Sequence, residues 1–231
     1  MKFPLSDRLL ACADLIAPGD RVADVGCDHG YLSIHLLKSG IARSCIASDI
    51  HEQPLLSAVR NAKKYDVRDK MEFYRCDGVA GIPRDFDCMV CAGMGADTMI
   101  SILEAAPWLK DSRYRLILQC QSKTPTLRRY LSENGWRITQ ETVLRDGRFL
   151  YTVMEVYFEP EYPRLTPGQW YFPPALLENP SHAVPAYYRW VLEGLRLSAA
   201  HRDDREQQQA LAELEALAKN PNLTWLKEEK A

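Results

Sequence analysis

Short apolar runs alternate with amphipathic stretches from residue 21 to residue 158. The runs, such as RVADV at 21–25, are short and almost uniformly apolar, as strands buried on both faces are. The stretches between them space their apolar residues three and four positions apart, which predicts helices. The predicted strands are residues 21–25, 43–48, 71–75, 86–91 and 115–120, and the predicted helices are residues 32–39, 53–65, 96–108 and 125–134. This alternation predicts a parallel sheet with helices on both faces.

The pattern changes after Gly135. Two strand-like runs, at 136–144 and 149–158, flank the sequence RDGR, in which Asp-Gly is a strong hairpin turn signal. A parallel series that ends in an antiparallel hairpin is the arrangement of the S-adenosylmethionine-dependent methyltransferase sheet, and a plain dinucleotide fold does not need it. The predicted fold class is therefore α/β: a Rossmann-like class I methyltransferase with a seven-stranded sheet whose last strand is antiparallel.

The remainder of the chain has a different character. Residues 159–183 contain six prolines, which predicts a linker wrapped on the surface with one short helix at 175–178. From residue 184 onward the apolar residues follow two helical stripes, which predicts a small antiparallel helical hairpin. The polar stretch 201–209 is either its exposed tip or the exposed middle of one long helix. The predicted domains are thus residues 1–158 and residues 159–231.

Composition limits the possible functions. The chain has 231 residues, of which 46% are apolar and 26% charged, and its net charge of −2 excludes a histone-like cationic binder. It does not exclude nucleic acid as a substrate, because a local patch can hide within a balanced total. There is no apolar window long enough for a membrane span and no signal peptide, so we expect a cytoplasmic protein.

The cysteines favour a core role over a metal site. Cys88 and Cys91 form a single C-x-x-C with no second pair, and most of the seven cysteines lie in apolar runs. Buried, reduced thiols explain this pattern better than zinc does. We therefore predict no metal.

The sequence DVGCDHGY, residues 24–31, follows the first strand and opens a helix. Glycines allow a tight turn and close approach of a ligand, and the helix N-terminus offers free N–H groups. The spacing D-x-G-x-x-x-G is that of methyltransferases rather than the G-x-G-x-x-G of dinucleotide sites. An ordinary tight turn is the alternative. The predicted cofactor-binding residues of this loop are Asp24, Gly26, Cys27, Asp28 and Gly30.

Two further acids follow the next two strands. Asp49, with Ile50 beside it, ends the second strand, where a carboxylate can accept hydrogen bonds from both ribose hydroxyls; a helix N-cap is the alternative. The sequence Cys76-Asp77-Gly78 follows the third strand, where Asp77 can accept a hydrogen bond from the adenine amine or simply form a turn. Because the carboxyl ends of parallel strands line one crevice, we expect all three acids to face one ligand.

The loop after the fourth strand, CAGMGAD at 91–97, is the predicted site of chemistry. Gly93 and Gly95 suggest a close approach of the backbone to the cofactor or a base, with Met94 against the cofactor. A ring nitrogen such as adenine N1 needs positioning and stabilisation of the developing positive charge more than a strong base. Asp28 or Asp97 can supply that charge, although Asp97 also suits a helix N-cap.

Two residues of the glycine loop complete the catalytic candidates. His29 can transfer a proton or cap the helix, and Tyr31 can stack on the base or pack on the sheet. The predicted catalytic set is Asp28, His29, Tyr31, Gly93 and Gly95.

Three segments together resemble the TrmK family of bacterial tRNA adenine-N1 methyltransferases: LSDRL at 5–9, VADVGCDHGYL at 22–32 and GMG at 93–95. Weaker similarity extends to residue 178. The resemblance implies a class I methyltransferase domain, a helical, coiled-coil-like C-terminal domain, S-adenosyl-L-methionine as cofactor, and methylation of adenine N1 at tRNA position 22. The Gln-Pro-Asn that often follows the family's fifth strand is Gln119-Cys120-Gln121 here, which leaves the target nucleotide open.

The expected partner is tRNA, with a monomeric enzyme and no obligate protein partner. The cations that can reach phosphates fall into two clusters: Lys63, Lys64, Arg68 and Lys70, and Lys123, Arg128, Arg129, Arg145 and Arg148. Tyr187, Tyr188, Arg189 and Trp190 suit RNA as well, or a hairpin core. Two alternatives remain: a methyltransferase for another nucleotide or a small molecule, and a non-catalytic cofactor-binding module that interacts with RNA.

Overall fold

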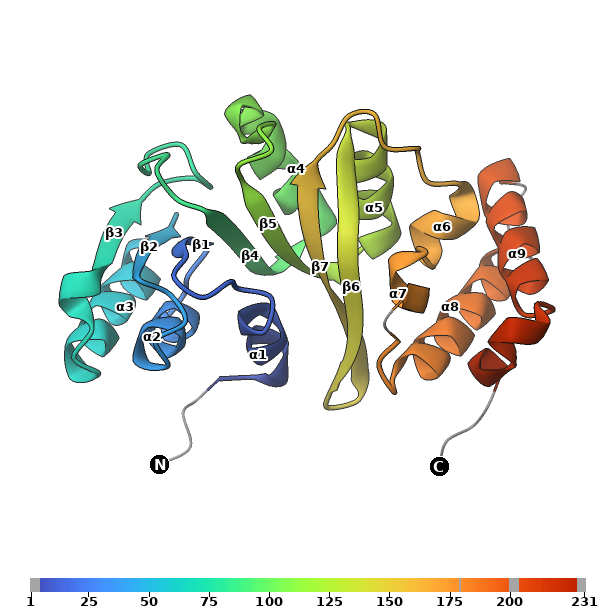
Figure 1. Ribbon diagram of the computed structural model, residues 1–231, viewed down its shortest axis with the longest axis horizontal. Helices are drawn as coiled ribbons and strands as arrows, with labels where there is room; N and C mark the ends of the chain where they lie inside the picture. Colours follow the sequence, from blue (N-terminus) through green and yellow to red (C-terminus); the bar gives the residue numbers. More distant parts are fainter. Residues whose placement is uncertain (1–4, 179, 200–203, 228–231) are drawn as a thin grey trace.

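A seven-stranded sheet forms the centre of the computed structural model, which describes residues 5–178, 180–199 and 204–227 (Figure 1). The strand order is β3-β2-β1-β4-β5-β7-β6, and β7 runs antiparallel to both of its neighbours. The strands are β1 (Arg21–Val25), β2 (Ser44–Asp49), β3 (Met71–Arg75), β4 (Cys88–Gly95), β5 (Arg115–Ser122), β6 (Trp136–Asp146) and β7 (Phe149–Phe158). The predicted fold class is confirmed.

Helices cover both faces of this sheet. The described α-helices are α1 (Asp7–Ala13), α2 (Tyr31–Lys38), α3 (Glu52–Lys64), α4 (Ala96–Ala105), α5 (Thr124–Glu133), α6 (Pro167–Tyr171), α7 (Ala175–Glu178), α8 (Val184–Ala199) and α9 (Arg205–Leu217). Short 3₁₀ helices occur at η1 (Arg68–Lys70), η2 (Pro107–Leu109) and η3 (Pro221–Lys227). None of the described helices is long and apolar enough to cross a membrane.

Alternation along the strands divides the core into two layers. Met89 and Cys91 of β4 pack on the face that α4 and α5 cover, whereas Cys88 and Val90 pack on the face of α1, α2 and α3. Because Cys88 and Cys91 point to opposite faces, this C-x-x-C cannot hold one metal ion. Both thiols are buried, and burial raises the pKa of each to about 12.

Several short elements differ from the sequence prediction. Helix α1 and the 3₁₀ turns were not predicted, because seven or fewer residues give too little periodicity to recognise. Strand β4 continues to Gly95, so most of the predicted loop 91–97 is an irregular extension of the sheet. Met94 pairs with Cys120 and Gly95 with Ser122 across register shifts.

The proline-rich segment is more ordered than a surface linker. It holds α6, which was not predicted, as well as the predicted helix α7. Thr166 and Gln169 form a capping box at the start of α6, and the side chains of Phe172 and Leu176 are buried.

The C-terminal helices form the predicted hairpin. Tyr188 of α8 donates a hydrogen bond to the carbonyl of Leu214 in α9, and Ser198 contacts Gln207, so the two helices run antiparallel. Of the polar stretch 201–209, residues 201–203 lie outside the described part of the chain. Residues 205–209 form the first turns of α9, whose N-terminus is capped by the Asp204 carboxylate.

Arg128 joins these helices to the sheet, and its placement corrects the prediction that it binds RNA. Its side chain is completely buried in α5, where it forms a 2.6 Å ion pair with Glu141 of β6. The guanidinium also donates to the carbonyls of Trp170 and Tyr171 and to the hydroxyl of Tyr187. A buried cation with this many partners cannot reach a phosphate, and it holds α5, β6, α6 and α8 together.

Candidate active site

A groove of about 320 Å³ opens at the carboxyl ends of β1 and β4. It collects most of the glycine loop and the start of the GMG segment, together with two residues of α1 that the sequence did not indicate. The lining residues are Arg8, Leu9, Asp24, Gly26, Cys27, Asp28, His29, Tyr31, Leu32, Ala92, Gly93, Met94 and Gln121. Two predicted segments that are distant in sequence therefore meet in one groove.

The backbone of the loop explains why two of its positions are glycine. Gly26 and Gly30 both have φ of +71°, in the left-handed region that favours glycine. A Cβ on Gly26 would lie 2.2 Å from Cε of Met94, and one on Gly30 would lie 2.9 Å from Cβ of Ala58. The loop is held against β2, because the N–H groups of Gly26 and Cys27 both donate to the carbonyl of Ser48.

Asp24 is a buried acid in the lining of this groove. Only 5% of it is exposed, and its carboxylate accepts a 2.7 Å hydrogen bond from the hydroxyl of Ser33. Burial raises the pKa of Asp24 to about 6, against the opposing effect of the Ser33 hydrogen bond. A buried acid with a raised pKa in a groove is a candidate functional residue.

Asp49 organises the backbone on both sides of it. One carboxylate oxygen accepts from the N–H of Asp28 at 3.2 Å and the other from the N–H of His51 at 2.8 Å. Each oxygen has a second lone pair, so the carboxylate retains acceptor capacity. His51 occupies the N-cap position of α3, so Asp49 is not the N-cap of that helix. Ile50 beside it is half exposed.

The third acid lies in a neighbouring hollow. Asp77 and Gly78 line a space of about 420 Å³ with Asp97 and Trp108, and not the groove of the glycine loop. The two regions are connected through β2, because the N–H of Cys76 donates to the carbonyl of Asp49. Asp24 and Asp28 therefore share one groove, and Asp77 stands apart from them.

Asp97 is also placed away from the groove. It lies in the first turn of α4, where Gly95 is the N-cap, and its carboxylate is 2.6 Å from Nζ of Lys123. Of the two acids considered for charge stabilisation, only Asp28 lines the groove. Gly95 is likewise absent from the lining; a Cβ there would lie 2.9 Å from Oγ of Ser122, so this glycine serves close strand packing.

Asp28, His29 and Tyr31 form a small polar cluster at the groove. The Asp28 side chain is 69% exposed and lies 3.5 Å from Nε2 of His29. The His29 and Tyr31 rings have centroids 6.0 Å apart. The carbonyl of His29 accepts from the amide of Asn61, which holds the loop against α3. The three predicted side chains are thus brought together where a substrate can reach them.

Gln119 and Arg8 are functional candidates to which the sequence analysis assigned no role of their own. The Gln119 side chain is completely buried, and its Oε1 accepts from the N–H of Gly93 at 3.0 Å and from Arg8 at 3.2 Å. Arg8 in turn forms a 2.9 Å ion pair with Asp146. Gly93 has φ of +80°, so Gln119 fixes an unusual backbone conformation beside the groove. A glutamine within the apolar run RLILQC was the available signal.

The sequence profile of a methyltransferase domain matches residues 5–154. The chain belongs to this methyltransferase-domain family. It is 31% identical over 154 residues to the tRNA (adenine(22)-N(1))-methyltransferase of Bacillus subtilis, a match that covers 66% of this chain and 65% of that one. The chain thus spans less than two thirds of the length of the curated relatives it matches first.

Solved structures resemble the chain over more of its length. Sp1610 of Streptococcus pneumoniae, described as a candidate tRNA (m1A22) methyltransferase, is 27% identical with a TM-score of 0.80, covering 93% of this chain and 98% of that one. The same protein has been solved with S-adenosyl-L-methionine. B. subtilis TrmK, at 24% identity and a TM-score of 0.76 over 98% of this chain and all of that one, shares the fold. The predicted resemblance to the TrmK family is confirmed.

Proposed function

We propose that this protein is an S-adenosyl-L-methionine-dependent tRNA methyltransferase that methylates N1 of adenine, with position 22 as the target. The observation that carries the proposal is the likeness to Sp1610 along nearly the whole chain, C-terminal helices included. The groove at the carboxyl ends of the strands supports it, because ligands of open α/β sheets bind at that edge.

The residues present fit the cofactor. The glycine loop leaves its backbone open to close approach, since Gly26 and Gly30 have no Cβ and turn in the left-handed region. Asp24 presents a buried carboxylate that suits the cofactor's ammonium group, and the first turn of α2 offers N–H groups to its carboxylate. When bound, the cofactor supplies a methyl group on a sulfonium. The proposed binding residues are Asp24, Gly26, Cys27, Asp28, Gly30, Asp49, Ile50, Cys76, Asp77, Gly78, Gly93 and Met94.

Two of these acids are assigned to the nucleoside. The free lone pairs of Asp49 accept from the ribose hydroxyls while its backbone bonds hold the carboxylate in place. Asp77, in the adjoining hollow, accepts from the adenine amine. This assignment requires the cofactor to extend from the groove, past Asp49, into the hollow that contains Trp108.

Methyl transfer needs an oriented adenine more than a base. N1 of adenine carries an in-plane lone pair, so no proton has to leave before transfer. The backbone at Gly93, fixed by Gln119, allows the base to approach closely. The Asp28 carboxylate stabilises the positive charge that develops on the ring. Asp28, His29, Tyr31 and Gly93 are the proposed catalytic set, and Gly95, which lies outside the groove lining, supports it only through the close packing of β4 on β5.

Methylation of an unmodified tRNA transcript, mapped by primer extension, tests this function. We expect a stop at adenine 22 with the wild-type chain. Asp28→Asn should lower kcat about 10- to 100-fold with little change in affinity for S-adenosylhomocysteine. Asp111→Asn, at an exposed acid outside both the groove and the hollow, should leave kcat near the wild-type value. A stop at another position would point to a different nucleotide, and cofactor binding without methylation of any RNA would favour the non-catalytic alternative.

We further propose a cytoplasmic, monomeric enzyme with no obligate protein partner, divided into residues 1–158 and 159–231. Seven unpaired cysteines suit a reducing compartment, and β7 ends at Phe158. Light scattering during size-exclusion chromatography tests the oligomeric state. A mass near 26.4 kDa is expected, and twice that mass would contradict the proposal.

A further inference from the structure

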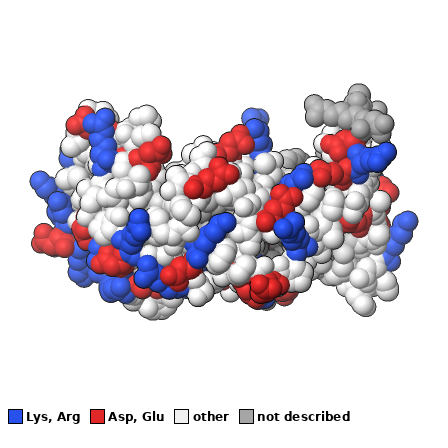
Figure 2. Space-filling model, turned by 90° about the horizontal axis from the view of Figure 1, so that it is seen from above, with Lys and Arg blue, Asp and Glu red and all other residues white. Residues whose placement is uncertain are grey.

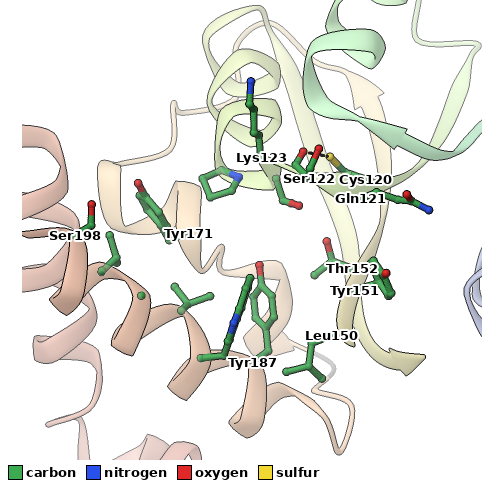
Figure 3. Close-up of a pocket in the computed structure, with 16 residues that line it drawn as sticks. Cys120, Gln121, Ser122, Lys123, Leu150, Tyr151, Thr152, Tyr171, Tyr187 and Ser198 are labelled. Carbon is green, nitrogen blue, oxygen red and sulfur yellow. Dashed lines mark hydrogen bonds between the residues drawn. The ribbon is translucent and has the colours of Figure 1, made fainter. Parts of the chain in front are cut away.

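A second cavity, of about 330 Å³, lies between the sheet and the C-terminal helices (Figure 3). Its volume falls in the range of roughly 300–1,000 Å³ typical of small-ligand sites. Residues of the β5–α5 connection, of β7, of α6 and of α8 line it: Cys120, Gln121, Ser122, Lys123, Thr124, Pro125, Leu150, Tyr151, Thr152, Tyr171, Tyr187, Trp190, Val191, Gly194, Leu195 and Ser198. None of the residues assigned above to the cofactor or to catalysis is among them.

Aromatic side chains dominate this cavity. Tyr151, Tyr171, Tyr187 and Trp190 come from three different elements, and the Tyr187 and Trp190 rings have centroids 5.8 Å apart. Figure 3 shows Tyr171 and Tyr187 on one side of the space and Tyr151 on the other. Trp190 is 60% exposed, so a large flat surface remains open to a ligand. Such rings are the platforms on which proteins stack unpaired bases.

The polar groups of the lining suit a neutral nucleobase attached to an anionic phosphate backbone. Among the described residues of the lining there is no carboxylate, and Lys123 is the only charged side chain. Thr152 is 2% exposed, and its hydroxyl has no hydrogen-bond partner within the described structure. A buried hydroxyl without a partner is costly, which points to a ligand or water that completes it. A nucleotide has donors and acceptors at the edge of its neutral base and carries its negative charge on the phosphate.

The cavity adjoins the candidate active site. Gln121 lines both the cavity and the groove of the glycine loop. The guanidinium of Arg8, a groove residue, lies 5.2 Å from the centroid of the Tyr151 ring. Because Gly93 and Met94 line only the groove, the base that receives the methyl group must enter the groove. A nucleotide next to it along the strand would then reach the aromatic cavity.

We propose that this aromatic cavity is a second base-binding site, which holds the unpaired nucleobase adjacent to the target adenine by stacking on Trp190 and its tyrosine neighbours. The inference rests on the proposed function, since it takes the substrate to be RNA. It assigns the C-terminal helices a direct part in substrate binding, because α8 supplies Trp190 and Tyr187.

The test compares three variants of α8. Their equilibrium binding to an unmodified tRNA transcript is measured by fluorescence anisotropy. Trp190→Ala should raise Kd about 5- to 20-fold, at the lower end for a base–aromatic stack because the ring is partly exposed. Trp190→Phe, which retains a flat ring, should stay within about threefold of wild type. Leu197→Ala, an exposed residue of the same helix outside the cavity lining, should leave Kd unchanged. Affinity for S-adenosylhomocysteine should be equal in all three, which verifies that each variant is folded.

A fluorescent base identifies the occupant. RNA with 2-aminopurine on either side of the target is expected to be quenched at one of those positions by wild type and not by Trp190→Ala. If Trp190→Ala binds RNA as tightly as Leu197→Ala, or if wild type quenches 2-aminopurine at neither flanking position, the proposal is wrong. These binding measurements need no methyl transfer, so failure of the proposed activity would be seen separately, as a wild-type chain that binds tRNA but does not methylate adenine 22.

Discussion

The glycine-loop groove and the aromatic cavity share Gln121, yet they are built in opposite ways. The groove is formed largely by backbone: residues 24–31 are consecutive, and their left-handed turns leave space for a ligand. The cavity is formed by side chains from β5, β7, α6 and α8, whose positions depend on long-range packing. The groove should therefore tolerate the loss of tertiary contacts better than the cavity does. Substitution of a loop glycine, in contrast, should affect the groove more.

Substitution of Arg128 should have the largest effect on stability, and it should disturb the elements that line the aromatic cavity. Arg128→Met leaves Glu141 buried and unpaired and leaves the carbonyls of Trp170 and Tyr171 without their donor. We expect the free energy of unfolding to fall by about 3–5 kcal/mol, measured by urea denaturation. Arg129→Met is the matched control, because its exposed pairs with Glu133 and Glu206 should contribute less than about 1 kcal/mol. Equal losses in the two variants would contradict the role given to Arg128.

Gly26→Ala should instead affect the groove. A methyl group there meets Met94 and the space that the cofactor needs, in a left-handed turn that strains alanine by about 1–2 kcal/mol. We expect affinity for S-adenosylhomocysteine, measured by calorimetry, to fall by roughly 30- to 100-fold. Gly40→Ala controls for the strain, because Gly40 has φ of +72° and no atom within 4 Å of its Cβ position. A Gly26→Ala chain that binds the cofactor product as Gly40→Ala does would show that the loop does not contact it.

The same contrast explains what the sequence could reveal. The strand–glycine–helix segment at 21–31 and the acid at 49 are local signals, and the structure places Asp24, Gly26 and Asp28 in one groove as expected. Asp77 was grouped with them because every strand end was assumed to face one space, and the sheet instead separates it. Of the four rings of the aromatic cavity, only Tyr187 and Trp190 lie in a contiguous segment that the sequence indicated, and the others, at 151 and 171, come from distant positions.

Arg128 shows how a local interpretation fails. An arginine beside Arg129 near the end of the sheet was interpreted as an exposed cation. Yet Leu127, Arg128 and Leu131 are buried on the same helix face, so the arginine lies within the apolar stripe of α5. Its partner Glu141 lies on the next strand. Only the three-dimensional pairing of a buried cation with a buried anion reveals its role.

Asp24→Asn should have a smaller effect on the groove, which is seen in how the free energy of unfolding depends on pH. The pKa of Asp24 in the folded chain, about 6, lies above the unfolded value of 3.8, so the folded state binds the extra proton. This contribution to stability is complete below pH 4 and is lost as pH rises through 6. The asparagine variant should therefore gain about 2 kcal/mol in unfolding free energy relative to wild type between pH 4 and pH 7.5. Parallel stability profiles of the two proteins over that range would contradict the raised pKa.

The smallest expected effect concerns the Lys and Arg side chains that bind RNA phosphates near both sites. On the face shown in Figure 2, Lys and Arg are interspersed with Asp and Glu and form no continuous positive surface. Within the predicted clusters, Lys123 and Arg129 are ion-paired, whereas Lys63 and Lys64 are exposed at the end of α3. The exposed cations of these clusters are thus scattered and form no single positive surface, so we expect a gentle salt dependence of tRNA binding.

A double variant in which glutamine replaces both Lys63 and Lys64 gives the salt dependence a quantitative test. Each phosphate contact that is lost should reduce the slope of log K against log salt concentration by about 1. We expect a reduction of about 1 to 2 for the double variant, with affinity weakened equally for all tRNA sequences, because phosphate contacts carry no base preference. Trp190→Ala should leave the slope unchanged, because stacking releases no counterions. A steep wild-type slope that the double variant does not alter would mean that RNA approaches over a different surface, away from α3.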